Sequence, residues 1–318
     1  MADLNKLFLE FNSNITLGKS KKENLKTGRN ALRNKIKEEF SEKARKQPKF
    51  CGQGSYMMKT TINPINDGEY DIDDGVYLQG FTDKEIEEWP VASTVHSWIK
   101  KSVENHTKTN PIDKNTCVRV VYAKDYHIDL PTYIVKDNIA YLAHKSEGWI
   151  KSDPRAFTEW FIGKVNKKGE QLRSLVKYLK AWKDYTGVDL KGISITILVG
   201  ENFYEYENRD DLSLIGTLTN IIEALEDEYV CIKPVTPNED LFDSHSDNKK
   251  NVIINALKNL RDAIQNAVDT NDEKKASDIM IKYFGDRFPK GESLEVEEKS
   301  EFIKTEAPAI IRNDGRSA

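Results

Sequence analysis

The chain has 318 residues, which is enough for one large domain or for two lobes separated by a cleft. Apolar residues make up 38% and charged residues 31%, and no apolar run approaches the roughly 20 residues that span a bilayer, so we expect no membrane partner. The net charge of −4 argues against a general polyanion binder. The sequence has no signal-peptide pattern, and its three cysteines are scattered, so we expect a cytoplasmic protein without a zinc site.

The first predicted element is a long amphipathic helix over residues 21–46. Its apolar positions recur at helical spacing, at Leu25, Leu32, Ile36 and Phe40, and lysines and arginines fill many of the positions between them. A basic helix face can contact nucleic acid, but it is also the ordinary exposed side of an amphipathic helix. We favour the second interpretation and expect no requirement for a nucleic acid.

A Gly-Ser pair and an acidic strand follow this helix. Gly54 and Ser55 form a turn, and a second polar turn over residues 63–68 reverses the chain. Alternation along the next strand places Asp71 and Asp73 on one face, where two neighbouring carboxylates repel each other unless a cation lies between them. Mg²⁺ suits such oxygen ligands, so the pattern predicts a site that holds a nucleoside triphosphate.

The pair Asp71 and Asp73 has a less specific explanation, which is an exposed strand edge. The turn, the strand pattern and the Gly-Ser pair agree with one another, and we therefore interpret the two aspartates as catalytic. Asp74 falls on the opposite face of the strand, where we expect it to point to solvent or to bond a turn.

A block of further strands is predicted at residues 118–122, 128–135 and 138–144. Residues 145–148 are expected to end this block. A Mg²⁺ site beside a triphosphate predicts nucleotidyl transfer, which with two metal ions needs a third carboxylate. Asp129 is the leading candidate, because an unpaired aspartate inside an apolar strand is unfavourable. A capping or turn role is the alternative for Asp129, and Asp125 is its rival as the ligand.

The second half of the chain has helical periodicity, beginning where Pro154 suits a first helical turn. Apolar stripes predict helices around residues 172–182, 214–225 and 251–268. Residues 193–199 are ambiguous, because their β-branched side chains favour a strand and their position between helices does not. The acidic segment 291–318 is expected to be a flexible tail.

Three cationic residues share one stripe of the first of these helices. Arg173, Lys177 and Lys180 lie opposite the apolar stripe, at spacings of four and three residues. A solvated surface is the simplest explanation, and we adopt it for Arg173 and Lys177. Lys180 is the candidate for binding a triphosphate, because the neighbouring Trp182 anchors that turn of the helix.

Seven short motifs occur in order between residues 48 and 241. They are Gln-Gly-Ser-Tyr at 53–56, Glu-Tyr-Asp-Ile-Asp at 69–73, His-Ile-Asp-Leu-Pro at 127–131, Tyr-Leu-Lys-Ala-Trp-Lys at 178–183, Gly-Ile-Ser at 192–194, Arg-Asp-Asp at 209–211 and Pro-Asn-Glu-Asp-Leu at 237–241. Together they resemble the bacterial cGAS/DncV-like nucleotidyltransferases, the CD-NTases of CBASS antiphage defence. The resemblance implies an α+β fold, with a polymerase-β-like lobe built on a mixed sheet and a helical lobe similar to that of oligoadenylate synthases.

The resemblance also implies domain limits and site residues. The catalytic lobe would cover residues 1–150, the helical lobe 151–290 and the tail 291–318. Two Mg²⁺ ions, or Mn²⁺ as a substitute, would bind the three aspartates Asp71, Asp73 and Asp129. Contacts to the triphosphates and bases would come from Gln53, Gly54, Ser55, Lys180, Ser194 and Asp240. Residues 193–199 would be a helix.

Two departures from the family pattern bear on these expectations. The family's small residue and Gly-Thr after the Gly-Ser are replaced by Met57, Met58, Lys59 and Thr60, which leaves the base preference open. The span from Asp129 to Lys180 is shorter than in the cholera-type cyclic GMP–AMP synthases, so a folate-type regulatory insertion is expected to be absent.

The resemblance implies an enzyme that joins nucleoside triphosphates, ATP among them, into a cyclic di- or trinucleotide messenger for a downstream effector. Two alternatives stay open: a linear nucleotidyltransferase acting on RNA, protein or a small molecule, and a nucleotide-binding scaffold with a degenerate site. Some family members are conjugated through their C-terminus by ubiquitin-transfer-like enzymes. The end of this chain, Gly-Arg-Ser-Ala at 315–318, is a candidate for such a partner.

Overall fold

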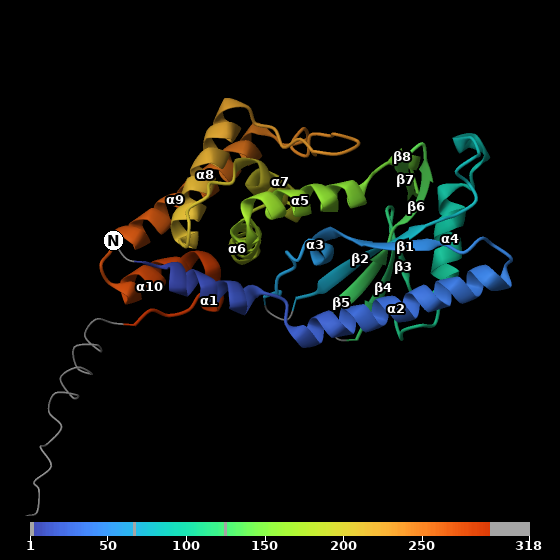
Figure 1. The fold of residues 1–318 in the computed structure, drawn as a ribbon, viewed down its shortest axis with the longest axis horizontal. Coiled ribbons are helices and arrows are strands. Elements are labelled where there is room, and N and C mark those ends of the chain that lie inside the picture. Colours follow the sequence, from blue (N-terminus) through green and yellow to red (C-terminus); the bar gives the residue numbers. More distant parts are fainter. Residues whose placement is uncertain (1–2, 66–67, 124–125, 293–318) are drawn as a thin grey trace, which may run out of the picture.

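The computed structural model describes residues 3–65, 68–123 and 126–292. Strands gather at one end of the molecule and a group of helices at the other, so that the chain forms two lobes (Figure 1). Within the described residues no helix has the length and apolar character needed to cross a membrane. The expected α+β fold with a mixed sheet and a helical lobe is confirmed.

Eight strands in the described residues form one mixed sheet in the order β3-β4-β5-β2-β6-β7-β8, with β1 paired to β2. Their bounds are β1 Lys49–Gln53, β2 Tyr70–Tyr77, β3 Ile112–Asp113, β4 Val118–Tyr122, β5 Tyr126–Leu130, β6 Thr132–Lys136, β7 Ile139–His144 and β8 Gly148–Lys151. Strand β2 is central: it runs parallel to β5 and β6 and antiparallel to β1. The acidic strand is therefore held by neighbours along its whole length.

The predicted strand over residues 128–135 is two strands, separated by Pro131. Proline cannot donate a ladder hydrogen bond, which interrupts the strand, but the carbonyl of Pro131 accepts one from the amide of Val76 at 2.8 Å. Both β5 and β6 therefore keep β2 as their parallel neighbour. The sheet also continues beyond residues 145–148, where we expected it to end, because β8 pairs with β7 across that turn.

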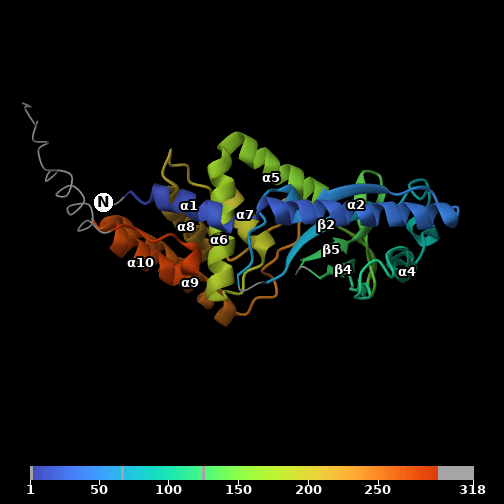
Figure 2. The same ribbon diagram turned by 90° about the horizontal axis from the view of Figure 1, so that it is seen from below.

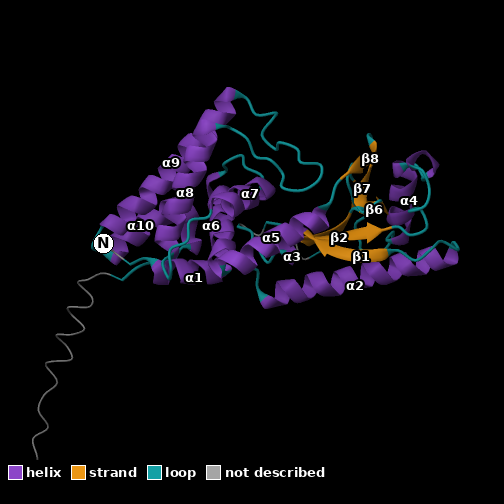
Figure 3. Cartoon of the chain, turned by 45° about the horizontal axis from the view of Figure 1, so that its top comes forward, coloured by secondary structure: helices purple, strands orange, loops and turns teal. Residues whose placement is uncertain are grey.

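Three helices belong to the sheet lobe, namely α2 Lys19–Glu42, α3 Gly54–Met57 and α4 Ala92–Ser102. The predicted amphipathic helix is confirmed as α2, whose apolar residues are buried in one core together with α4 and residues of the sheet. Figure 3 shows α2 running beside the strands. One short 3₁₀ turn, Ile86–Glu88, precedes α4.

The second lobe consists of helices packed around α6. Their bounds are α1 Asn5–Ile15, α5 Pro154–Lys168, α6 Glu170–Thr186, α7 Gly192–Asn202, α8 Asp210–Asp227, α9 Asp247–Asp269 and α10 Glu273–Phe284, followed by the 3₁₀ turn Gly285–Arg287. The three predicted apolar stripes are buried in the common core of this lobe. Residues 193–199 lie within helix α7, as the family resemblance implied, because tertiary burial outweighs the preference of β-branched residues for strands.

Helix α1 belongs to the core of the helical lobe, although residues 1–150 were assigned to the catalytic lobe. Phe8 and Phe11 are fully buried there, and the ring of Phe11 lies 4.7 Å from that of Phe284 and 5.5 Å from that of Tyr178. Figure 2 shows α1 beside α6 and α10, while α2 continues toward the sheet. The first and the last described α-helices, α1 and α10, therefore lie in the same lobe. Of the expected flexible tail 291–318, residues 293–318 lie outside the described residues.

Candidate functional site

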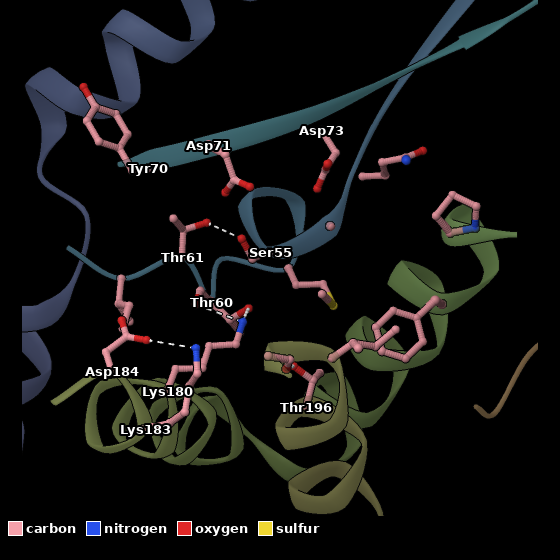
Figure 4. Close-up of a pocket in the computed structure, with 18 of the residues that line it drawn as sticks. Ser55, Thr60, Thr61, Tyr70, Asp71, Asp73, Lys180, Lys183, Asp184 and Thr196 are labelled. Atoms are coloured by element: carbon pink, nitrogen blue, oxygen red, sulfur yellow. Dashed lines mark hydrogen bonds and ion pairs between the residues drawn. The ribbon is translucent and has the colours of Figure 1, made fainter. Parts of the chain in front are cut away.

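A cavity of about 570 Å³ lies between the two lobes (Figure 4). One wall comes from the end of β1, from α3 and from the start of β2, and the other from α5, α6 and α7. Of the nine residues predicted to bind metal or nucleotide, six line this cavity: Gln53, Gly54, Ser55, Asp71, Asp73 and Lys180. Segments more than 100 residues apart in the sequence therefore meet here.

The Gly-Ser segment is shaped by the close approach of a carboxylate. Gly54 has φ +69°, and a Cβ at this position would lie 2.3 Å from Oδ2 of Asp73. Only glycine fits there, because any side chain would be strained and would collide with that oxygen. The next residue, Ser55, shares a hydrogen bond of 2.8 Å with the hydroxyl of Thr61. The backbone of α3 is thus held against the acidic strand.

Asp71 and Asp73 point from β2 toward the cavity, on the same face of the strand (Figure 4). Burial, followed by the negative charges of Asp71 and Asp129, raises the pKa of Asp73 to about 8. Burial also raises the pKa of Asp71, but His127, Arg119 and Lys180 together outweigh it and lower that pKa below its ordinary value. Asp71 is therefore held in its charged form, whereas burial and the neighbouring negative charges favour the protonated form of Asp73.

Asp129 lies beside Asp73 in the parallel register of β5 with β2. Both of its carboxylate oxygens accept hydrogen bonds of 2.7 Å from Arg119, the residue directly across the antiparallel pair β4–β5. This ion pair accounts for an aspartate inside the strand, and Asp129 is not part of the cavity wall. The rival residue, Asp125, lies outside the described residues.

A divalent cation fits the chemistry of the cavity, although the described side chains do not by themselves form a complete metal site. No group of three or more His, Cys, Asp or Glu residues in the described ranges is arranged to hold a metal ion. Mg²⁺ in nucleotide enzymes is, however, often bound by one or two carboxylates together with substrate phosphates. Asp71 and Asp73 supply such carboxylates, and a bound cation would offset the burial and the neighbouring negative charges that raise the pKa of Asp73.

Lys180 reaches the cavity from α6, opposite the acidic strand (Figure 4). Its ammonium donates to the hydroxyl of Thr60 at 3.0 Å. Burial lowers the pKa of Lys180 to about 8, against the opposing effect of Asp71 and Asp184. A lysine ammonium on the wall of a cavity is well suited to bind phosphate oxygens.

Lys183 and Asp184 also line the cavity, and the sequence interpretation did not include them. The ammonium of Lys183 lies 3.3 Å from a carboxylate oxygen of Asp184. The signal that could have found Lys183 is its position three residues after Lys180, which places both on one face of α6.

Two predicted nucleotide contacts do not reach the cavity. Ser194 is buried inside the helical lobe, and the cavity is lined instead by Gly192, Ile193 and Thr196, which form the other face of α7. The carboxylate of Asp240 accepts hydrogen bonds from the amides of Cys231 and Phe242, so it stabilises a turn. The sequence motifs identified the right segments but not which face of each one meets the cavity.

Three charged residues expected at the surface are buried. Asp74 is fully buried and forms a bidentate ion pair with Arg33 of α2, because its side of β2 is the face that α2 covers. Arg173 and Lys177 are 8% and 7% exposed, since the junction of α1 and α2 and the residues after α3 cover that side of α6. Helical spacing alone could not reveal these neighbours.

The sequence matches two families that together cover most of the chain. Residues 48–133 match the family described as "Cyclic GMP-AMP synthase DncV-like, nucleotidyltransferase domain", and residues 169–297 match "Cyclic GMP-AMP synthase, C-terminal domain". A cyclic GMP-AMP synthase from Escherichia albertii is 30% identical in an alignment of 218 residues, and the match covers 64% of this chain and 47% of that protein. The chain therefore spans about half the length of this relative.

Other relatives make different products according to their names. A cyclic AMP-AMP-AMP synthase from Acinetobacter sp. is 26% identical in an alignment of 262 residues, and the match covers 76% of this chain and 72% of that protein. The crystal structure of Vibrio cholerae DncV, a cyclic AMP-GMP synthase, has the same fold, with a TM-score of 0.75 at 19% identity over 90% of this chain and 97% of that one. The chain therefore belongs to the DncV-like nucleotidyltransferases.

Proposed function

We propose that this protein is a divalent-metal-dependent synthase that joins nucleoside triphosphates into a cyclic di- or trinucleotide. The observation that carries the proposal is the interlobe cavity, where Asp71 and Asp73 face Lys180 across a space bounded by Gly54 and Ser55. Its volume of about 570 Å³ lies within the range of about 300–1,000 Å³ found for small-molecule sites. Carboxylates on one wall and a half-buried ammonium on the other are the groups that a metal-bound triphosphate requires.

The reaction would join two nucleotides by an in-line displacement. A ribose hydroxyl loses its proton to solvent while its oxygen forms a bond to the α-phosphorus of the second nucleotide, and the bond from that phosphorus to pyrophosphate breaks. Lys180 would bind the departing phosphates, and the backbone of Gly54 and Ser55 would orient the triphosphate. A second displacement within the linear intermediate would close the ring and release a second pyrophosphate.

Mg²⁺ is the cation that we assign to the carboxylates, with Mn²⁺ as a substitute. When bound, such ions lower the pKa of an attacking hydroxyl and neutralise the charge of the leaving pyrophosphate. Asp71 and Asp73 would hold them together with the substrate phosphates. Asp129 would join as the third carboxylate through the lone pairs that Arg119 leaves free, because Arg119 donates one hydrogen bond to each of its oxygens.

The bases, the linkage and the ring size are left open. Similar proteins are named for cyclic GMP-AMP, cyclic AMP-AMP-AMP and cyclic di-GMP synthesis, so family membership does not select one product. A role in antiphage signalling through a downstream effector rests on the family resemblance. The open alternatives are linear transfer to RNA, protein or a small molecule, and a scaffold that binds nucleotides without turnover.

Incubation with labelled ATP, GTP, CTP and UTP, in Mg²⁺ or Mn²⁺, separates these alternatives. We expect products that resist phosphatase, because a ring has no terminal phosphate. Products that phosphatase degrades would indicate linear transfer, and nucleotide binding without any product would indicate a scaffold. The double variant Asp71→Asn with Asp73→Asn, purified in the same way, controls for contaminating enzymes.

A further inference from the structure

A second cavity lies behind the wall of the first one. Its volume is about 490 Å³, and it is bounded by the junction of α1 and α2, by α3 and by the first two turns of α6. Figure 2 shows α6 beside the point where α1 gives way to α2. The two cavities share Thr61, whose hydroxyl holds Ser55 of the first one.

The lining of this cavity is strongly cationic. Four cationic side chains, Lys22, Lys59, Arg173 and Lys177, face it, and Glu170 is the one carboxylate among its lining residues. Glu170 is paired with Arg173 and is 77% exposed, so it lies toward solvent. The excess positive charge at the cavity is therefore not neutralised by the residues that line it.

Lys177 is the most unusual of these groups. It is 7% exposed, and its ammonium donates to the hydroxyl of Thr16 at 2.9 Å. Among the described residues no carboxylate lies within ion-pair distance of it, and burial, with the charges of Lys22 and Arg173, lowers its pKa to about 8. Desolvation and repulsion from neighbouring cations make a buried ammonium unfavourable, and a bound anion would offset both effects.

Arg173 connects the cavity to the loop that follows α3. Its guanidinium donates to the carbonyl of Met58 at 2.8 Å and is buried. Tyr56 and Met57 turn their side chains to the second cavity, while Gly54 and Ser55 line the first. Helix α3 and its loop thus form a thin wall between a cavity that bears Asp71 and Asp73 and one with four cationic side chains and one carboxylate.

We propose that this basic cavity binds the phosphate groups of a small molecule, at a site distinct from the nucleotidyl transfer site. The four cations supply the donors, and Leu17, Tyr56 and Met57 supply an apolar side. The volume suits a small polyphosphate or a nucleotide. The inference does not depend on the proposed synthase activity, because it concerns binding alone.

Metal-free binding of inorganic triphosphate tests the inference. In EDTA, Asp71 and Asp73 repel a polyanion from the first cavity, whereas the basic cavity needs no metal. By calorimetry we expect one binding site in the wild type, and an affinity at least about tenfold weaker in Lys177→Met, since a charge-assisted hydrogen bond is lost. Lys177→Arg should retain most of the affinity.

Lys22→Met and Lys26→Met form a matched pair on α2. The two lysines lie one helical turn apart and both are exposed, but only Lys22 lines the cavity. Weaker binding in Lys22→Met with unchanged binding in Lys26→Met supports the site even if Lys177→Met does not fold. Loss of binding in Lys180→Met would assign the anion to the first cavity and overturn the inference.

Two further ligands identify the source of the phosphate. ATP that binds in EDTA more tightly than triphosphate would show that the apolar side contacts a nucleoside, and equal affinities would show recognition of the phosphates alone. A short RNA duplex that displaces triphosphate with higher affinity would overturn the assignment to a small molecule. Absence of triphosphate binding in the wild type would overturn the site itself.

Discussion

Asp73 illustrates how a single side chain in this protein is controlled by its neighbours. Its carboxylate lies against the backbone of Gly54, on the same strand face as Asp71 and beside Asp129 in the sheet register. The pKa of about 8 that results means that this carboxylate is protonated in much of the metal-free protein near neutral pH. A bound cation would have to displace that proton, which couples metal binding to pH.

The double variant Asp71→Asn with Asp73→Asn is expected to abolish synthesis without unfolding the protein. Amides remove the charges that would bind a metal, and they also relieve the repulsion within the carboxylate cluster. We therefore expect a melting temperature at or above that of the wild type, measured by calorimetry beside a product assay. Asp83→Asn, at an exposed position, is the control and should change neither. Turnover in the double variant would refute the assignment of these carboxylates.

Lys177 gives a prediction for the pH dependence of stability. Its pKa is about 8 in the folded protein and 10.5 for an ordinary lysine, so between these values the unfolded chain binds more protons than the folded one. The contribution of Lys177 to the free energy of unfolding must therefore rise as the pH increases through this window.

Urea unfolding of the wild type and of Lys177→Met, from about pH 7 to about pH 10, measures that contribution. The stability of the wild type relative to the variant should increase with pH, because the variant lacks the titrating group. Lys26→Met should show no such trend relative to the wild type. A flat difference for Lys177→Met would mean that its ammonium is not desolvated in the folded protein.

At the scale of elements, α3 is the part that brings the two cavities together. It is only one turn long, from Gly54 to Met57, so its position depends on its contacts rather than on helix propensity. Ser55 bonds Thr61, and Arg173 bonds the carbonyl of Met58. These contacts fix one end of α3 to its own loop and the other to the helical lobe.

Gly54→Ala is expected to abolish synthesis and to destabilise the protein. The added Cβ would lie 2.3 Å from the carboxylate of Asp73 at φ +69°, so either α3 or Asp73 must move. Gly163→Ala in α5 is the matched control: nothing lies within 4 Å of its Cβ, and alanine should stabilise the helix by about 0.5–1 kcal/mol. Thermal melts and product assays of both variants test this prediction. Synthesis by Gly54→Ala would show that the contact between the Gly54 backbone and the Asp73 carboxylate is not needed for activity.

At the scale of the whole molecule, helix α1, the first described helix, packs against α10, the last described α-helix. Its apolar face contacts α6 and α10, while α2, which follows directly, covers the sheet of the other lobe. The junction between α1 and α2 therefore crosses from one lobe to the other beside the second cavity. Two cores of different composition are linked by this short segment.

Phe11→Ala is expected to lower the free energy of unfolding by about 3–5 kcal/mol, because its fully buried ring leaves a cavity between Tyr178 and Phe284. Leu9→Ala on the same helix, at a side chain 52% exposed, should cost much less. Equilibrium unfolding in urea compares the two. Equal losses would mean that α1 is not held by its buried face.

The sequence by itself determined the features that depend on neighbours along the chain. Alternation placed Asp71 and Asp73 on one face of a strand, and apolar stripes located α2, α6, α8 and α9, because each pattern repeats with the period of its own element. The family motifs resolved the ambiguity of residues 193–199 in favour of the helix that the structure has. The two-lobed α+β architecture was therefore predictable before any contact was known.

Only the tertiary structure decided what each face meets. Ser194 is buried in the core of the helical lobe, and Arg119 donates hydrogen bonds to Asp129. Asp74 forms an ion pair with Arg33. Arg173 and Lys177 are buried beside the second cavity. Periodicity reports how residues are arranged within one element, and it carries no information about which distant element packs on that face. The charge balance of each cavity arises from such packing, and for this reason the basic cavity could not be found in the sequence.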